Sequence, residues 1–209
     1  MMIHRTALAT LFAALSFAAS TASARLITFD DLADNGVGTA INNGYAGLDW
    51  DNFKVIDTNT KDFPPSGFVN GIVSGHNIAY NDLANSATIS SSTGFNLVDA
   101  YFTGAWNNGL QIDVFASSAT DFFSTSFTVD SNGPKDIIFN WNNITSVTFS
   151  SSGGTDAGFP LSDPQFVMDN LTVTSTVPEP DAWFLMMIGI PLAFRKIRLG
   201  QKNIALPKG

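Results

Sequence analysis

Between Arg25 and Thr176 the chain alternates short apolar runs with segments rich in Asn, Asp, Gly, Ser and Thr. No stretch keeps a helical period, whereas several alternate apolar and polar residues with the period of two that a half-buried strand requires. Residues 110–114 (LQIDV) and 146–150 (SVTFS) show this alternation most clearly. Similar patterns and short apolar runs predict further strands over 26–29, 48–56, 68–73, 77–80, 87–91, 95–103, 127–129, 136–141 and 165–174.

Turn-forming residues separate these strands at 107–109 (NNG), 131–134 (SNGP) and 151–154 (SSGG). Many short strands without helices between them favour an all-β fold, an antiparallel β-sandwich, over an α/β sheet. A domain of about 150 residues can hold a single core that buries roughly 70% of the unfolded surface. Because the chain has no Cys, that core has to stabilise the domain without disulfides.

The last predicted strand changes phase at Asp169-Asn170. The apolar residues before this pair, Phe166 and Met168, share one parity, and those after it, Leu171 and Val173, share the other. A β-bulge at Asp169-Asn170 would restore the inward direction of the later residues.

The first 24 residues have the three-part layout of a secretory signal peptide. Arg5 supplies the positive charge, residues 7–19 form the apolar stretch, and Ala22-Ser23-Ala24 forms a small-x-small cleavage site. We therefore expect export through the Sec translocon, cleavage by signal peptidase after Ala24, and a mature chain that begins at about Arg25. The alternative, a first helix of the domain, is disfavoured because the stretch has no polar face.

A second apolar segment, residues 182–194 (AWFLMMIGIPLAF), lies near the C-terminus. It follows Val177-Pro178-Glu179-Pro180 and precedes a basic cluster of Arg195, Lys196 and Arg198. As a helix it would span about 20 Å of a hydrocarbon layer of roughly 30 Å, which suits a short, transient transmembrane anchor. The basic cluster would act as the stop-transfer signal, with residues 199–209 as a cytoplasmic tail. The prolines disfavour the alternative of a buried C-terminal helix.

This tripartite tail, from Val177 to Arg198, resembles the PEP-CTERM sorting signal of exported bacterial proteins. The resemblance implies processing by an exosortase, a membrane-embedded cysteine-type transpeptidase, and a place in the cell envelope or in an exopolysaccharide biofilm matrix. The chain departs from the family pattern in two respects. Its apolar stretch is rich in Met and contains Pro191, and residues 199–209 continue beyond the basic cluster.

The strand pattern also resembles the jelly-roll ectodomains of such proteins, which are similar to carbohydrate-binding modules. The residues that carry this resemblance are 26–30 (LITFD) and 166–173 (FVMDNLTV). It implies that the first and last strands lie near each other and that a structural calcium ion can join them. Calcium takes six to eight oxygen ligands, so Asp30 and Asp169 are the predicted ligands. The alternative is that both residues cap turns through their carboxylates.

Composition and charge exclude several other functions. The net charge is −8, and the predicted β domain has no basic face, so we expect no nucleic-acid partner. The absence of Cys removes thiol nucleophiles and zinc–thiolate sites. His76 is the only His of the predicted mature chain and is interpreted as a loop residue, which disfavours a Ser-His-Asp site.

Several large amphipathic rings outside the two terminal segments are candidates for stacking on sugars. They are Tyr45, Trp50, Tyr101, Trp106 and Trp141. Trp106, beside the turn at 107–109, is the strongest candidate for glycan binding, whereas Trp50 is expected to face inward. The alternative places all three Trp in the core. Asp49 and Asp51 lie about 6–7 Å apart on one strand face and leave a hydrolytic site open.

The sequence therefore predicts a non-enzymatic, exported bacterial surface protein, transiently anchored in the membrane and processed by an exosortase. A glycan-binding module on the same β-sandwich is the alternative, and a secreted polysaccharide hydrolase is the second alternative. The predicted domain occupies residues 25–176, and no cofactor is expected apart from the structural calcium.

Overall fold

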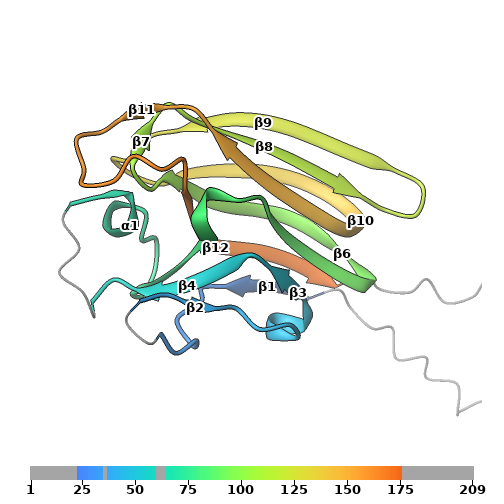
Figure 1. Cartoon of the computed structure of the whole chain (residues 1–209). Helices are drawn as coiled ribbons and strands as arrows, with labels where there is room; N and C mark the ends of the chain where they lie inside the picture. Colours follow the sequence, from blue (N-terminus) through green and yellow to red (C-terminus); the bar gives the residue numbers. More distant parts are fainter. Residues whose placement is uncertain (1–22, 35–36, 60–64, 176–209) are drawn as a thin grey trace, which may run out of the picture. The chain divides into compact units, whose positions relative to one another are not determined.

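The computed structural model describes residues 23–34, 37–59 and 65–175. This part of the chain is built almost entirely of β-strands (Figure 1). The strands are β1 (Ala24–Ile27), β2 (Thr39–Ala40), β3 (Asp49–Asp51), β4 (Phe53–Asp57), β5 (Asn77–Asn81), β6 (Ala87–Gly104), β7 (Asn107–Asn108), β8 (Leu110–Ser117), β9 (Phe122–Val129), β10 (Lys135–Ser152), β11 (Thr155–Asp156) and β12 (Phe166–Ser175). One short helix, α1 (Gly67–Asn70), and two 3-10 turns accompany them.

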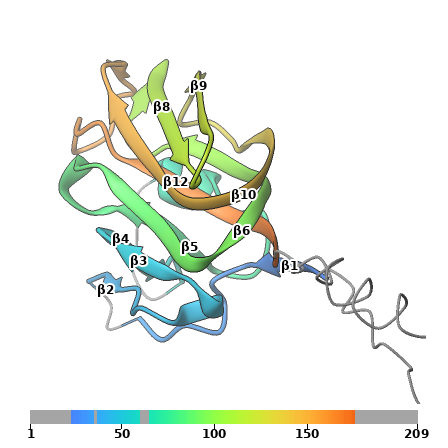
Figure 2. The ribbon, with the colours of Figure 1, turned by 90° about the vertical axis from the view of Figure 1, so that its right-hand side faces the viewer.

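Ten of these strands form one antiparallel sheet in the order β2-β4-β5-β12-β6-β10-β8-β9, with β1 paired to β12 and β3 to β6. Strands β7 and β11 form a separate two-stranded sheet. The large sheet folds over on itself, so that β8 and β9 lie on one side of the molecule and β1, β2 and β4 on the other (Figures 1 and 2). The prediction of an all-β, antiparallel β-sandwich is confirmed. The two predicted terminal helices lie outside the described residues.

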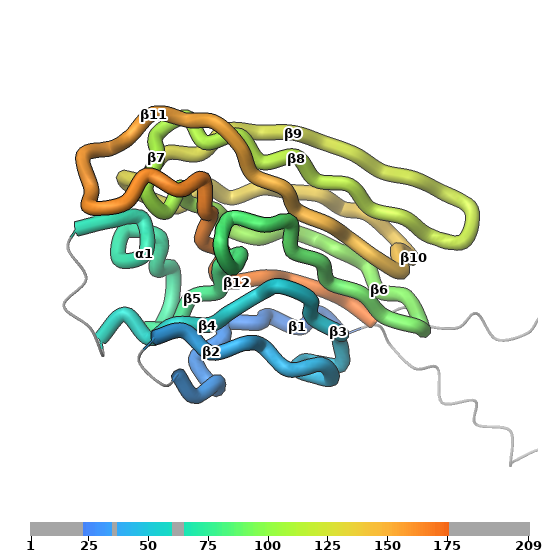
Figure 3. The backbone as a smooth tube through the Cα atoms, viewed as in Figure 1, coloured from blue at the N-terminus to red at the C-terminus, as the bar shows by residue number. Residues whose placement is uncertain are grey.

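Two long strands carry the sheet from one layer to the other. Strands β6 and β10 each have 18 residues, and the tube in Figure 3 follows both of them along the body of the domain. Their pairing shifts register between Ile138 and Ser146. Asn140 and Asn143 adopt positive φ angles of 52° and 53° within this stretch, a conformation that Asn tolerates better than most residues. Such bulges bend a strand and increase its twist, which lets β10 serve both layers.

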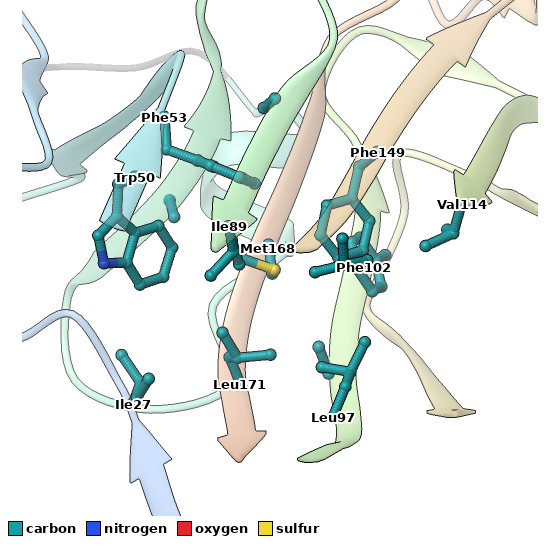
Figure 4. Close-up of a cluster of buried hydrophobic side chains, with 14 of the residues drawn as sticks. Ile27, Trp50, Phe53, Ile89, Leu97, Phe102, Val114, Phe149, Met168 and Leu171 are labelled. Atoms are coloured by element: carbon teal, nitrogen blue, oxygen red, sulfur yellow. The ribbon is translucent and has the colours of Figure 1, made fainter. Parts of the chain in front are cut away.

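The core lies between the two layers and combines aromatic rings with aliphatic side chains (Figure 4). Phe102 is fully buried at its centre, and its ring centroid lies 5.2–6.3 Å from those of four other Phe residues. These neighbours are Phe127, Phe139, Phe149 and Phe166. Strand β8 adds Leu110, Ile112, Val114 and Ala116, all buried, as the period of two predicts.

The predicted strand over 68–73 is wrong, because α1 and a following turn occupy most of this stretch. Gly67 explains the tight turn, since a Cβ atom there would lie 1.8 Å from the carbonyl oxygen of Gly104. Phe68 then packs against Tyr80 and Trp106 in a second, smaller apolar cluster. A short run such as FVNGIV does not distinguish a strand from a buried turn by its periodicity.

Other predicted features are confirmed. The pairing of β12 with β6 shifts register between Asp169 and Thr172, and Asn170 has a φ of 51°, which is the expected bulge. The first and last strands are neighbours, since β1 pairs with β12 from Ala24↔Thr174 to Ile27↔Leu171.

The single strand expected over 48–56 is divided into β3 and β4 at Asn52, whose φ is 58°.

Within residues 23–34, 37–59 and 65–175, no helix is long and apolar enough to span a membrane. The predicted signal peptide up to Ala22, the sorting motif Val177-Pro178-Glu179-Pro180 and the stop-transfer cluster at Arg195, Lys196 and Arg198 lie outside the described residues.

Candidate functional site

The outward face of β8, β9 and β10 is the candidate site. Side chains alternate between the two faces of a strand, so the buried residues of β8 leave Gln111, Asp113 and Phe115 pointing away from the core. The register places Ser126 and Ser150 beside Asp113 on the two neighbouring strands, and Ser124 and Thr148 beside Phe115. Small hydroxyl side chains therefore surround one carboxylate and one aromatic ring.

These residues line a shallow groove with a volume of about 460 Å³. Asp113, Phe115, Ser124, Ser126, Thr148 and Ser150 form its walls, together with Val114 and Thr125 between them. The groove is open to solvent and lies on the strands themselves, so rigid hydrogen-bonded backbone holds its walls in place. A ligand that matches this surface needs several hydroxyl groups and at least one apolar face.

The apolar part of the site is a stacked pair of phenylalanines. The ring centroids of Phe115 and Phe122 lie 5.9 Å apart with an interplanar angle of 29°. Their side chains are 52% and 74% exposed, although burying a Phe ring is worth about 1.5–3 kcal/mol. Ser117 pairs with Phe122 across the β8–β9 ladder, which places both rings on the outward face. An exposed, ordered aromatic pair of this kind is a natural stacking surface.

Hydrogen bonds order the polar part of the site. The Nε2 group of Gln111 donates to Oδ1 of Asp113 over 2.9 Å. Two hydroxyl pairs join β10 to the neighbouring segment of the chain: Thr88 with Thr148 at 2.9 Å, and Ser86 with Ser150 at 2.7 Å. Hydroxyl groups both donate and accept hydrogen bonds, so this row can meet ligand hydroxyl groups in either sense.

The polar row continues from the groove across the sheet to β3. Thr88 pairs with Asp51, and Ser90 pairs with Asp49, on the far side of β6. Both carboxylates are exposed, and Trp50 between them is buried at 6% exposure, as expected. Four strand spacings separate β3 from β9, or about 19 Å at the usual distance between strands. Extended chains could therefore cross several strands of this face.

Trp106, the predicted glycan-binding residue, does not lie in this site. Its side chain is 5% exposed, and its Nε1 group donates to Oε1 of Gln165 over 2.9 Å. The ring packs against Phe68 and Phe159. A sugar cannot stack on a ring in this position, so the expectation of an exposed Trp106 is corrected. The alternative considered for this residue, a place in the core, describes the structure.

The other candidate rings lie away from the groove or inside the domain. Tyr45 and Trp50 pack on each other and on Phe29. The Tyr45 hydroxyl group donates to Oδ1 of Asp31 over 2.6 Å. Burial is the main cause that raises the pKa of Tyr45, and this hydrogen bond raises it further. Trp141 is half-buried and stacks on Phe123.

The predicted calcium ligands Asp30 and Asp169 meet at one loop. The N–H groups of Val73 and Ser74 donate to Oδ2 of Asp169 over 2.7 and 3.0 Å. Two residues further on, the N–H groups of His76 and Asn77 donate to Oδ1 of Asp30 over 2.8 and 3.1 Å. Both carboxylates thus hold the loop before β5, Asp30 from the segment that follows β1 and Asp169 from the bulge within β12.

Their surroundings move the two pKa values in opposite directions. Burial raises the pKa of Asp169, and the nearby charge of Asp30 adds to this, against the backbone N–H bonds that lower it. Burial also acts to raise the pKa of Asp30, but the N–H groups of His76 and Asn77 and the Thr28 side chain bring it below its ordinary value. Asp30 is therefore the carboxylate that stays charged at lower pH.

The donor set around these two residues is small for calcium. In the described part of the chain no group of three or more His, Cys, Asp or Glu residues could hold a metal ion. Oδ1 of Asp30 and Oδ2 of Asp169 each accept two backbone N–H bonds. Calcium binding at Asp30 and Asp169 stays a prediction. The hydrogen bonds that both carboxylates accept show that they hold the loop before β5 in place.

Solved structures of carbohydrate-binding modules are similar to this chain. No family model matches the chain, and no curated protein matches it. TmCBM61, in complex with β-1,4-galactotriose, is 15% identical over 62% of this chain and 87% of its own, with a TM-score of 0.38. The family 11 carbohydrate-binding module from Clostridium thermocellum, in complex with a β-1,3-1,4-mixed-linked tetrasaccharide, is 11% identical over 77% of this chain and 100% of its own, with a TM-score of 0.37.

Proposed function

We propose that this chain is an exported, non-enzymatic bacterial surface protein whose β-sandwich binds polysaccharide in the groove on β8, β9 and β10. The observation that carries the proposal is the exposed Phe115–Phe122 pair beside a groove lined with hydroxyl groups. A pyranose ring has C–H groups on its faces and hydroxyl groups around its edge. The site offers the complementary set, with aromatic faces beside Ser, Thr and Asp oxygens.

The two parts of the site would contribute differently to binding. The Phe rings would take apolar surface of the sugar out of water, which is worth about 25 cal/mol for each Å². Ser124, Ser126, Thr148 and Ser150 would exchange their water hydrogen bonds for bonds to sugar hydroxyl groups, with a small net gain. Affinity would therefore depend mainly on the rings, and orientation on the hydroxyl groups.

Replacing Phe115 with alanine is expected to weaken polysaccharide binding about tenfold. The variant loses the ring that lines the groove and leaves Phe122 without its stacking partner, and base–aromatic stacking, a comparable contact, is worth about 1–3 kcal/mol. Affinity electrophoresis of the domain 25–176 in gels that contain soluble plant and bacterial polysaccharides measures the effect.

Trp106→Phe is the matched control for that experiment, because the residue is aromatic but buried outside the groove. We expect this variant to bind like the parent domain. Retention of full binding by Phe115→Ala, or equal loss in both variants at unchanged thermal stability, would contradict the proposed site.

The terminal segments support the exported part of the proposal. The N-terminal segment has the layout of a signal peptide, and the segment 177–198 resembles the PEP-CTERM sorting signal, with Val177-Pro178-Glu179-Pro180 as its motif. Signal peptidase would act after Ala24, and an exosortase would process the chain at the sorting segment. The product would be released into the cell envelope or the extracellular matrix.

The intact mass of the protein purified from its native host tests both processing steps together. We expect a chain that begins at Arg25 and has lost the basic cluster at Arg195 to Arg198. Alanine substitution of Pro178, Glu179 and Pro180 is expected to leave the C-terminal segment attached while the N-terminal cleavage continues. A polypeptide of all 209 residues in the cytosol would contradict this part of the proposal.

A further inference from the structure

We propose that the groove selects uncharged polysaccharides and rejects anionic ones, an inference that rests on the proposed glycan-binding function. The reason is the charge of the face that carries the groove. Asp113 lines the groove directly, and Asp49 and Asp51 stand on β3 at the opposite margin of the same face. An anionic chain that crosses this face would meet carboxylates on β3 and again on β8.

No described cation is placed to compensate these carboxylates within the groove lining. The described residues contain three Lys or Arg side chains. Lys54 forms an ion pair with Asp82 at 3.0 Å, and Arg25 lies on β1 opposite Val173. Lys135 donates to the carbonyl oxygen of Thr128 over 3.1 Å, at the end of β9. Recognition of carboxylate or sulfate groups normally uses Arg or Lys.

Asp113 is also held in a position that favours neutral hydroxyl groups. Gln111 binds its Oδ1 atom, which fixes the carboxylate and leaves Oδ2 as an acceptor for a ligand O–H group. Ser126 and Ser150 flank it on both sides. A carboxylate that accepts from a hydroxyl group forms a charge-assisted bond, whereas a second carboxylate at the same place adds repulsion between like charges.

Matched pairs of soluble polymers with the same backbone test this selectivity. Hydroxyethyl cellulose is compared with carboxymethyl cellulose, and fully methyl-esterified polygalacturonate with polygalacturonate, by affinity electrophoresis of the domain 25–176 at low salt. We expect at least one neutral polymer to retard the domain and the anionic polymers to bind at least tenfold more weakly. The difference should shrink in 1 M salt, because screening reduces repulsion between exposed charges.

Asp113→Asn is expected to narrow the difference between neutral and anionic polymers several-fold, because it removes the charge and keeps the shape. Asp136→Asn serves as the matched control, since Asp136 is exposed on the other half of β10 and does not line the groove. The same thermal midpoint for all three proteins would show that folding is unaffected.

The outcomes separate the two proposals. If no polymer of either kind binds, the glycan-binding function is wrong and the selectivity falls with it. If anionic polymers bind as tightly as neutral ones, the selectivity is wrong while the glycan-binding function stands. If the parent domain discriminates but Asp113→Asn discriminates equally, the assignment of selectivity to Asp113 is overturned.

Discussion

Replacing Phe102 with alanine is expected to lower the free energy of unfolding of the β domain by about 4 kcal/mol. Phe102 is fully buried, and its ring contacts four other Phe rings that come from β9, β10 and β12. The substitution would remove the ring at which these strands meet and leave a cavity that the rigid sheet cannot close. Urea denaturation followed by tryptophan fluorescence would measure the change.

Phe122→Ala is the matched control, because the same side chain is deleted where it is 74% exposed. We expect this variant to unfold within about 0.5 kcal/mol of the parent domain, as is usual for surface substitutions. Equal effects of the two substitutions would contradict the central position of Phe102 in the core.

Replacing Asp169 with alanine is expected to destabilise the domain by about 3 kcal/mol. The side chain is fully buried and accepts hydrogen bonds from the N–H groups of Val73, Ser74 and Asn170. The variant would leave these donors without their acceptor and release the loop before β5. Hydrogen exchange of the Val73 and Ser74 amides would increase together with the loss of stability.

Asp49→Ala controls for the loss of a carboxylate, because Asp49 is exposed on β3; its effect should stay within about 0.5 kcal/mol.

Repeating the measurement with millimolar calcium tests the predicted metal site as well. Stabilisation of the parent domain by calcium that Asp169→Ala abolishes would support the site. An unchanged parent domain would mean that Asp169 acts through the loop alone. Parent-like stability of Asp169→Ala without calcium would contradict the loop contact.

Strand alternation and parity were the reliable signals in this sequence. The phase change at Asp169-Asn170 predicted the bulge, because apolar residues on both sides of it must face the same core. The same alternation placed Leu110 and Ile112 inward. It could not show that β6 and β10 are single long strands, because the bends at Asn140 and Asn143 depend on packing between layers that are distant in sequence.

The groove could not be found from the sequence for a related reason. Phe115 and Phe122 are adjacent only because β8 and β9 pair with Ser117 opposite Phe122. The alternation along β8 places Phe115 on the outward face, where the other residues are polar, but it does not show which residue of another strand lies beside it. Trp106 was the predicted glycan-binding residue because it is a large ring beside the turn at 107–109. Its partner Gln165 comes from a distant segment, so nothing near Trp106 in the sequence indicates its burial.

The position of β12 has a mechanical consequence. This strand is hydrogen-bonded to β1, β5 and β6 and is the last strand of the domain. At its Ser175 end the strand pairs with β1 on one side and β6 on the other, so a pulling force that enters there is shared between two ladders and does not peel an edge strand away one bond at a time. A domain attached by this end while its opposite layer holds a polymer would resist load along its central strands.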